Sequence, residues 1–394
     1  MTSDPISVAE FNLSRLERVL SGANAITRLS AELDRLGATR VVIVTGRTLG
    51  ASARLESLKA SIGDRCVGVF ADARQHVPSS TVVELVRVIE REHANALVSF
   101  GGGSPIDTVK AAAFTLLNAG GESQAHTLKR ALHESAADGP AHIAIPTTLS
   151  AGEFTSVAGI TNEQTRVKRP VHDARIAPRV VIMDPGLTLD TPEWLWVGTA
   201  MRAVDHAVEA IYSVRHHPVG ETMASRGLAL IVEHLLPSIR TSGDERLEHR
   251  LQCQMAAWLS VFGMTNAGFG LSHALGHQIG PRWNVPHGFT SCITLPHAMR
   301  FMADRAPERF GPVAAGLGLP FDVDRSSEAA RACADRIGDF IGQFDVPRRL
   351  RDAHIPRDEV GDIAVVVRDA MEEAGAVSQP ISTEEIAAVL EAAY

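Results

Sequence analysis

The chain has 394 residues, of which 45% are hydrophobic, so it can bury a large core and its length indicates two domains rather than one. The formal net charge is −8, and no basic tract with interleaved aromatic residues is present, which argues against nucleic-acid binding and leaves small molecules as the expected partners. No apolar run approaches the roughly 20 residues that span a bilayer. Residues 1–20 lack the order of basic and apolar residues of a signal peptide, so we expect a cytoplasmic protein without a membrane partner.

The four cysteines predict neither disulfides nor a thiolate metal site. They are far apart in the sequence and form no CxxC pair: Cys66, Cys253, Cys292 and Cys333. We expect buried free thiols.

The first half of the chain alternates short apolar runs with helical patterns. Unbroken β-branched runs of this kind are typical of a parallel sheet that is covered on both faces, so the expected architecture is a doubly wound α/β domain. The runs lie at residues 40–45, 66–72, 96–103, 141–148 and 179–185.

The second half has a different pattern. After Pro192 the β-rich runs largely stop, and apolar residues recur at helical spacing in 226–240 and 326–344. The segment 184–192 carries two prolines, a glycine and two aspartates, which marks a boundary. We therefore predict an α/β domain over residues 1–188 and an all-helical domain over 189–394.

A run of three glycines follows the third apolar run, in the sequence ALVSFGGGSPIDTVKAAA. Gly101, Gly102 and Gly103 allow the backbone to approach a ligand closely. Ser104 is a suitable N-cap, Pro105 suits the first helical position, and Asp107 completes a capping-box pattern. Because ligands bind at the carboxyl ends of such strands, where a helix N-terminus attracts anions, we predict pyrophosphate binding here. The spacing is not GxGxxG, which argues against an ordinary Rossmann dehydrogenase.

A second polar loop follows the next apolar run, in IPTTLSAGEFTSVAGIT. The hydroxyls of Thr147, Thr148 and Ser150 could bind ribose, phosphate or amide groups of a cofactor. A loop that satisfies its own backbone would have the same composition, so this motif alone does not decide.

Histidines gather in GLSHALGHQIGPRWNVPHG. His273 and His277 are four residues apart on one predicted helix face, and His287 follows from a nearby loop, which is a common way to assemble a divalent-metal site. His206 can join them from the helix in TAMRAVDHAVEAIYS, whereas His297 is expected to be structural.

Arg202 lies one helical turn before His206, where a carboxylate ligand would complete such a site. A permanent cation would repel a divalent ion. Asp205 is a poor replacement ligand, since neighbouring residues on a helix point about 100° apart. At i+3 it could instead form a solvated ion pair with Arg202, worth tenths of a kcal/mol.

The chain resembles the iron-containing alcohol dehydrogenase family, of dehydroquinate-synthase-like fold, and within it the branch of maleylacetate reductases. Five ordered motifs carry the resemblance: GGGSPIDTVK, IPTTLSAGEFT, TRVKRPVHDARIAPRVVIMDPGLTL, AMRAVDHAVEAIYS and GLSHALGHQIGPRWNVPHG. The resemblance implies an NAD(P)-binding α/β domain, a helical second domain, an active site in the cleft between them, and a homodimer.

The resemblance also implies roles for individual residues. The pyrophosphate would lie on Gly101, Gly102, Gly103 and Ser104, the nicotinamide half on Thr147, Thr148 and Ser150, and the ribose near Lys168. Three of the family's four metal ligands match His206, His273 and His287, and His277 matches an active-site histidine beside the substrate. Arg202 replaces the fourth ligand, an aspartate, so a requirement for Fe²⁺ or Zn²⁺ is in doubt.

The cofactor preference follows from another difference. Many family members carry an aspartate after the first strand that disfavours a 2′-phosphate, and here the stretch reads VTGRTL, with Gly46 and Arg47. Both NADH and NADPH are therefore expected to bind.

The leading hypothesis is reversible hydride transfer between the nicotinamide and a carbonyl or carbinol carbon. Protonated His277, helped by His206, would stabilise the substrate oxyanion, and Arg202 would clamp a carboxylate in bidentate fashion, as in a keto acid such as maleylacetate. In the alternative, three histidines hold Fe²⁺ or Zn²⁺ and the substrate is a simple alcohol or aldehyde. A lyase or cyclase like dehydroquinate synthase is a third hypothesis.

Overall fold

The computed structural model describes residues 11–118, 139–165, 167–374 and 380–394. Residues 1–10, for which no signal peptide is expected, and Arg166 of the third motif lie outside these ranges.

A six-stranded sheet forms the centre of the first half, in the order β1-β8-β5-β4-β2-β3. All of its pairings are parallel, which confirms the predicted sheet. Five strands coincide with the five apolar runs. The strands are β1 (Arg18–Ser21), β2 (Val41–Val44), β3 (Cys66–Phe70), β4 (Ala96–Gly101), β5 (Ala141–Pro146) and β8 (Val180–Met183).

The strand order places a topological switch point between β2 and β4. The chain leaves β2 toward β3 on one side and leaves β4 toward β5 on the other side. A crevice for ligands opens at the carboxyl ends of two such strands. In this protein those ends lead into Gly46 and into the glycines that begin with Gly101.

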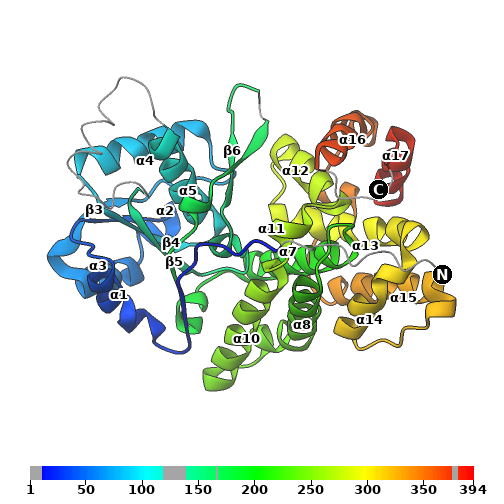
Figure 1. Cartoon of the computed structure of the whole chain (residues 1–394), viewed down its shortest axis with the longest axis horizontal. Helices are drawn as coiled ribbons and strands as arrows, with labels where there is room; N and C mark the ends of the chain where they lie inside the picture. The colour runs from blue at the N-terminus through cyan, green and yellow to red at the C-terminus, as the bar shows by residue number, and fades with distance from the viewer. Residues whose placement is uncertain (1–10, 119–138, 166, 375–379) are drawn as a thin grey trace, which may run out of the picture.

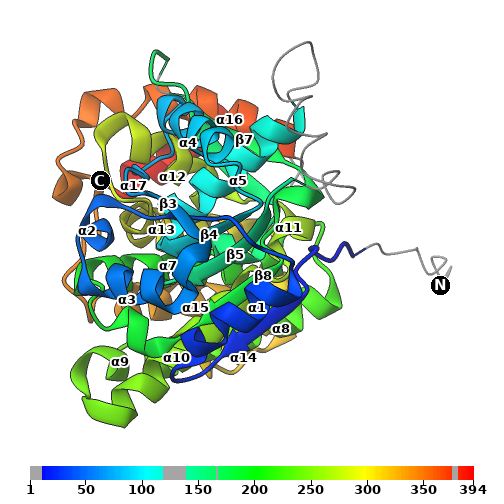
Figure 2. The same cartoon turned by 90° about the vertical axis from the view of Figure 1, so that its left-hand side faces the viewer.

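Helices cover both faces of the sheet, because successive strand residues point in opposite directions. Val41 and Ile43 pack against α1 and α3, whereas Val42 and Val44 pack against α4 and α5. Figure 2 shows this half of the molecule facing the viewer. The helices are α1 (Leu29–Arg35), α2 (Arg47–Gly50), α3 (Ala53–Ile62), α4 (Ser79–Arg91) and α5 (Gly103–Asn118).

Two further strands form an antiparallel hairpin that the sequence did not predict. They are β6 (Val157–Thr161) and β7 (Lys168–His172), with Thr161 opposite Lys168. The hairpin packs against α5 and places Lys168 near the carboxyl end of the main sheet.

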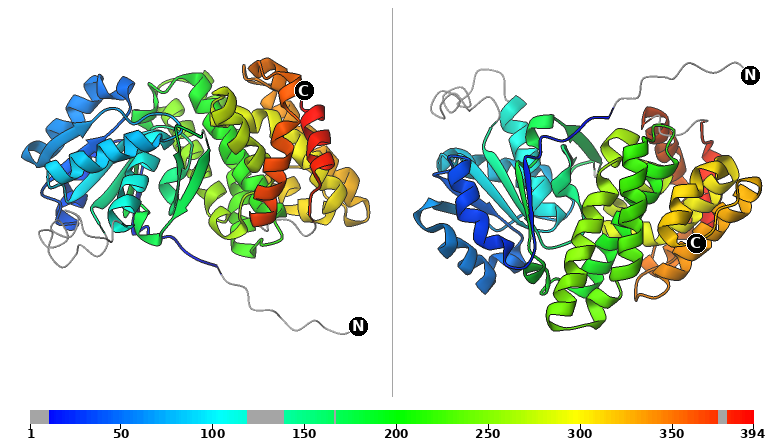
Figure 3. Two further views of the ribbon diagram at one scale, coloured as in Figure 1. Left: turned by 90° about the horizontal axis from the view of Figure 1, so that it is seen from above. Right: turned by 60° about the horizontal axis from the view of Figure 1, so that its bottom comes forward.

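The second half is helical, as predicted, and begins with the long buried helix α7 (Glu193–Tyr212). Figures 1 and 3 show the helices, from green to red, on one side of the sheet. The predicted helix over 226–240 is divided because Pro237 starts a new helix. The others are α8 (Pro218–His234), α9 (Pro237–Arg240), α10 (Gly243–Val261), α11 (Met264–Ala267), α12 (Leu271–Trp283), α13 (His287–Arg305), α14 (Gly311–Leu317), α15 (Ser326–Ile341), α16 (Asp362–Ala374) and α17 (Thr383–Ala392).

Helix α7 packs against α8, α10 and α13 and is the centre of the larger core. The helices α16 and α17 close a second core over α12 and α13. In the described ranges, no helix has both the length and the apolar character to cross a membrane. The four cysteines are free thiols, as predicted, but only Cys253, Cys292 and Cys333 are buried, because Cys66 lies on the edge strand β3 and is partly exposed.

Candidate active site

A cavity of about 690 Å³ lies where the sheet meets the helical half. This volume is within the roughly 300–1,000 Å³ of small-molecule sites. Every predicted site residue lines it: Gly101, Gly102, Gly103, Ser104, Thr147, Thr148, Ser150, Lys168, Arg202, His206, His273, His277 and His287. The structure therefore brings both predicted clusters into one space.

The glycine turn lies against the second polar loop. A Cβ at Gly102 would come within 3.0 Å of the Thr148 side chain, and one at Gly103 within 3.2 Å of the Ser150 hydroxyl. Gly101 has a φ of +141°, which side chains rarely adopt. The glycines are thus required for this close approach.

The predicted helix cap at this turn is wrong. Helix α5 begins at Gly103, so Ser104 and Pro105 lie inside its first turn. Asp107 pairs with Lys110 at 2.8 Å rather than closing a capping box. The physical reason is the glycine conformation, since the chain turns at Gly101 and the helix starts earlier than a serine cap would require.

The turn and the loop fit a dinucleotide. The hydroxyls of Thr148 and Ser150 are buried and have no hydrogen-bond partner among the described residues, so they are available to ligand oxygens. The glycines beside them expose backbone that a larger residue would cover. The assignment of pyrophosphate and nicotinamide to these residues stays a prediction.

Four imidazoles line the helical side of the cavity. His206 comes from α7, His273 and His277 from α12, and His287 begins α13. The potential ligand atoms of His273, His277 and His287 lie within 4.8 Å of one another. His206 instead stacks on His273, with ring centroids 5.5 Å apart. The candidate metal-ligand set in the structure thus contains His277, whereas the set implied by the resemblance contained His206 instead.

The charges around these imidazoles fit a divalent ion poorly. The three clustered donors are neutral and include no carboxylate. Burial lowers the pKa of each of the four histidines well below 6.5, and the positive charge of Arg202 lowers each pKa further. The same field would repel a metal cation. The lowered pKa of His277 disfavours the protonated imidazole that the sequence analysis expected.

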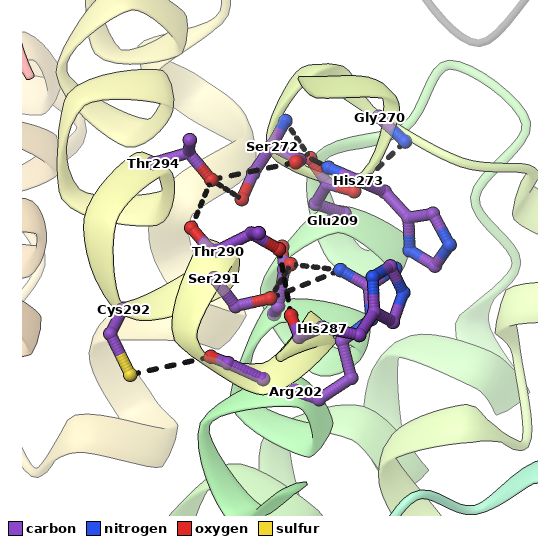
Figure 4. Close-up of polar contacts among 12 residues, drawn as sticks. Arg202, Glu209, Gly270, Ser272, His273, His287, Thr290, Ser291, Cys292 and Thr294 are labelled. Carbon is purple, nitrogen blue, oxygen red and sulfur yellow. Dashed lines mark hydrogen bonds and ion pairs between the residues drawn. The ribbon is translucent and has the colours of Figure 1, made fainter. Parts of the chain in front are cut away.

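Arg202 forms the ion pair with Asp205 that the sequence predicted, but the pair is buried rather than solvated. Its Nη1 donates to Asp205 Oδ2 at 2.7 Å. The same nitrogen donates to Ser291 Oγ at 3.0 Å (Figure 4). Burial lowers the pKa of Arg202, and the charges of Asp205 and Glu209 oppose this change. Nη1 is therefore occupied by the protein, and the bidentate clamp of a substrate carboxylate by Arg202 stays a prediction.

Glu209 is a buried residue that the sequence analysis missed. It lies seven residues after Arg202 on the same helix, and its carboxylate accepts the N–H groups of Gly270 at 2.9 Å and Ser272 at 2.7 Å (Figure 4). These groups precede and begin α12, so Glu209 holds the helix that carries His273. Burial raises the pKa of Glu209 to about 8. The spacing along α7 was the signal that could have revealed it.

Two residues of the α/β half complete the wall. Burial lowers the pKa of Lys168, and the charges of Arg202 and Lys110 add to this effect while Asp107 opposes it. His76, also missed, has a left-handed backbone with a φ of 63°, and its Nε2 is buried without a partner in the described structure. Its position after the third parallel strand was the available signal.

A dinucleotide-type turn that faces clustered imidazoles across a cavity defines a nicotinamide-dependent oxidoreductase of the α/β-plus-helical type. Residues 17–185 match the family described as "Iron-containing alcohol dehydrogenase", and residues 196–394 match "Fe-containing alcohol dehydrogenase family, C-terminal". The chain belongs to the iron-containing alcohol dehydrogenase family, and it is an NAD(P)-dependent oxidoreductase. The predicted family and fold class are thereby confirmed.

Two relatives with different names are similar to nearly the whole length of this chain. It is 30% identical over 381 residues to a maleylacetate reductase of Burkholderia cepacia, which covers 97% of this chain and 96% of the relative. It is also 30% identical over 362 residues to an NAD-dependent methanol dehydrogenase of Bacillus methanolicus, covering 91% and 93%.

Solved structures give the same fold. A putative alcohol dehydrogenase from Ralstonia eutropha JMP134 aligns with a TM-score of 0.80 at 29% identity, over 100% of this chain and 98% of that one. A maleylacetate reductase from Agrobacterium tumefaciens aligns with a TM-score of 0.76 at 27% identity, over 99% of both chains.

Proposed function

We propose that this protein reduces the carbonyl group of a short carboxylated ketone, such as maleylacetate, with NADH or NADPH and without an essential metal. The observation that carries the proposal is the buried guanidinium of Arg202 in the cavity wall. A buried cation that faces a ligand cavity favours an anionic substrate, and a guanidinium suits a carboxylate. The similarity to proteins named maleylacetate reductase supports the same substrate class.

The bound nicotinamide supplies the hydride, and the side chains of this chain handle the substrate oxygen. As the hydride reaches the carbonyl carbon, negative charge develops on the oxygen, and the fixed charge of Arg202 stabilises it. The N–H of neutral His277 donates a hydrogen bond to that oxygen. This imidazole can release its proton to the oxygen while its other nitrogen takes up a proton from solvent, so no imidazolium has to exist beforehand.

NADPH use has its own support. Gly46, at the carboxyl end of β2, brings no negative charge toward a 2′-phosphate, and Arg47 at the cavity mouth is largely exposed. The Arg47 guanidinium pairs with Asp72 at 2.6 Å. We expect Arg47 to exchange this exposed ion pair for a phosphate at little cost, because surface pairs contribute about 1 kcal/mol or less.

A metal-dependent alcohol or aldehyde dehydrogenase is the second candidate. The close approach of His273, His277 and His287 favours it, since three imidazoles can hold Fe²⁺ or Zn²⁺. The similarity to a protein named methanol dehydrogenase points the same way. Arg202 would then lie beside a divalent ion, which is the weakness of this candidate.

One preparation distinguishes the two. The protein is purified without a histidine tag or added metal, its metal content is measured by elemental mass spectrometry, and NADH oxidation is followed with maleylacetate and with butanal. We expect sub-stoichiometric metal, faster turnover of maleylacetate, and a loss of roughly 100-fold in kcat/KM for maleylacetate in Arg202→Ala. Arg202→Lys keeps the charge and should regain part of this loss. Stoichiometric iron or zinc with a preference for butanal would establish the second candidate instead.

A further inference from the structure

Two buried side chains from two helices hold the guanidinium nitrogen Nη1 of Arg202. Asp205 lies on the same helix, α7, and Ser291 comes from α13. Nη1 donates to Asp205 Oδ2 at 2.7 Å and to Ser291 Oγ at 3.0 Å, and Ser291 Oγ donates to the same Oδ2 at 2.6 Å. The exposed fractions of Arg202, Asp205 and Ser291 are 3%, 0% and 1%.

The two terminal nitrogens of Arg202 therefore differ. A guanidinium nitrogen Nη carries two protons, and both protons of Nη1 have acceptors in this arrangement. Nη2 is buried as well, but it has no hydrogen-bond acceptor among the described residues. Arg202 lines the cavity, and its buried Nη2 has donor capacity left over for a ligand oxygen.

We infer that Asp205 and Ser291 are positioning residues that hold Nη1 so that Nη2 selects the carboxylate of the substrate. This inference rests on the proposed function and deepens it. An arginine side chain has many rotamers, and an i,i+3 partner alone leaves several of them open. A second acceptor from another helix restricts the guanidinium to one orientation.

The other nearby carboxylate is committed elsewhere. Glu209 accepts the backbone N–H groups of Gly270 and Ser272, so it is held at the start of α12 rather than paired with Arg202. Lys168 is a second cation that lines the cavity, and its charge adds to burial and to the charge of Arg202 in lowering the pKa of His277. Without Asp205, the guanidinium would lose its ion-pair partner and remain in the field of that second cation.

The position of the guanidinium also limits the substrate. A Cβ at Gly276 would lie 3.8 Å from Nη1, so the guanidinium lies against the turn of α12 between His273 and His277. Residues that are one helical turn apart are separated by only about 5.4 Å along the helix axis. A carboxylate on Nη2 and a carbonyl oxygen at His277 must therefore be separated by few bonds, which is a feature of short oxo acids.

The test compares matched carbonyl compounds with and without a carboxylate. Glyoxylate is paired with acetaldehyde, and succinic semialdehyde is paired with butanal, and the selectivity is the ratio of kcat/KM within each pair. We expect the unmodified enzyme to prefer the carboxylated member by roughly 10- to 100-fold, as one charge-assisted hydrogen bond would give. Asp205→Ala should reduce the selectivity at least tenfold, through a raised KM for the acid.

Graded variants separate positioning from folding. Asp205→Asn keeps an acceptor oxygen and should recover part of the selectivity, and Ser291→Ala should reduce it by a smaller factor. Glu328→Ala breaks an exposed i,i+3 pair with Arg325 on α15 and serves as the matched control with unchanged selectivity. Malonate is a probe independent of turnover, and it should raise the melting temperature of the unmodified enzyme more than that of Ser291→Ala.

The outcomes are distinguishable. If the unmodified enzyme has no preference for the carboxylated members, the proposed function fails. If it has the preference and both Ser291→Ala and Asp205→Ala keep it in full, the positioning inference is overturned. If Asp205→Ala does not fold, the nearly isosteric Ser291→Ala decides by its selectivity and its malonate shift.

Discussion

The contact between α7 and α13 leaves no room for a side chain at Gly288. A Cβ added there would lie 2.0 Å from the carbonyl oxygen of Gly198 and 2.2 Å from its carbonyl carbon. Ordinary contact begins at 3.4 Å, so the helices would have to separate by about 3.4 − 2.0 = 1.4 Å. The obstructing atoms are backbone, and no rotamer change can relieve them.

We expect Gly288→Ala to lower the free energy of unfolding by at least about 3 kcal/mol, at the upper end of overpacking effects. At about 2 °C per kcal/mol for a large domain, the melting temperature should fall by roughly 6 °C or more. Activity should fall further than stability alone implies, because His287 and Ser291 move with α13.

Gly338→Ala is the matched control. Gly338 lies inside α15, and an added Cβ would meet nothing within 4 Å. Alanine is the better helix former by about 0.5–1 kcal/mol, so this variant should be slightly more stable than the unmodified protein. Both are measured by differential scanning fluorimetry and by chemical denaturation. A melting temperature of Gly288→Ala within 1 °C of that of the unmodified protein would correspond to a change of roughly 0.5 kcal/mol in the free energy of unfolding. Such a small change would refute the described contact between the helices.

Three other predictions concern single carboxylates and their charge. Burial raises the pKa of Glu153 from 4.5 to about 7, so between these pH values the unfolded state binds fewer protons and stability falls as the pH rises. The free energy of unfolding should therefore decrease by up to roughly 3 kcal/mol between pH 5 and pH 8 because of Glu153, and Glu153→Gln should abolish this decrease in denaturation measurements at the two pH values. Glu209→Ala should cost about 2–4 kcal/mol because two buried N–H groups lose their acceptor, and Glu209→Gln should cost less in the same denaturation assay. Gly46→Asp should lower kcat/KM with NADPH relative to NADH by roughly tenfold, and an unchanged ratio in steady-state kinetics would show that the 2′-phosphate lies elsewhere.

The sequence predicted those parts of the fold whose signal is local. Each of the five apolar runs became a strand. The strands β2, β4, β5 and β8 are buried, which explains their apolar composition, whereas β3 at the edge of the sheet is only partly buried. Strand β1 has exposed ends and the sequence RVLS, so no apolar run marks it, and it exists through its pairing with β8. The β6–β7 hairpin contains Pro170 and charged residues, which hid it from the same criterion.

The site shows the same division between local and long-range information. The i,i+3 spacing predicted that Arg202 meets Asp205, because helical geometry alone brings them together. Their burial depends on α13, which is 89 residues away at Ser291, and no spacing rule reports it. The early start of α5 also escaped prediction, because the conformation of Gly101 decides it and glycine permits several.

The positive charge around the imidazoles affects both metal binding and the binding of a charged substrate. The cations Arg202 and Lys168 line the cavity around the imidazoles. The carboxylate of Asp205 is held by Arg202 and Ser291, whereas Glu209, whose pKa burial raises to about 8, brings little negative charge at neutral pH. A divalent ion would add positive charge to a region that already has an excess, whereas a substrate carboxylate would reduce that excess. Arg202 therefore makes the two ligands alternatives, and each variant that weakens its charge should lose carboxylate selectivity and gain metal affinity together. A variant that changed one without the other would show that the guanidinium does not control both.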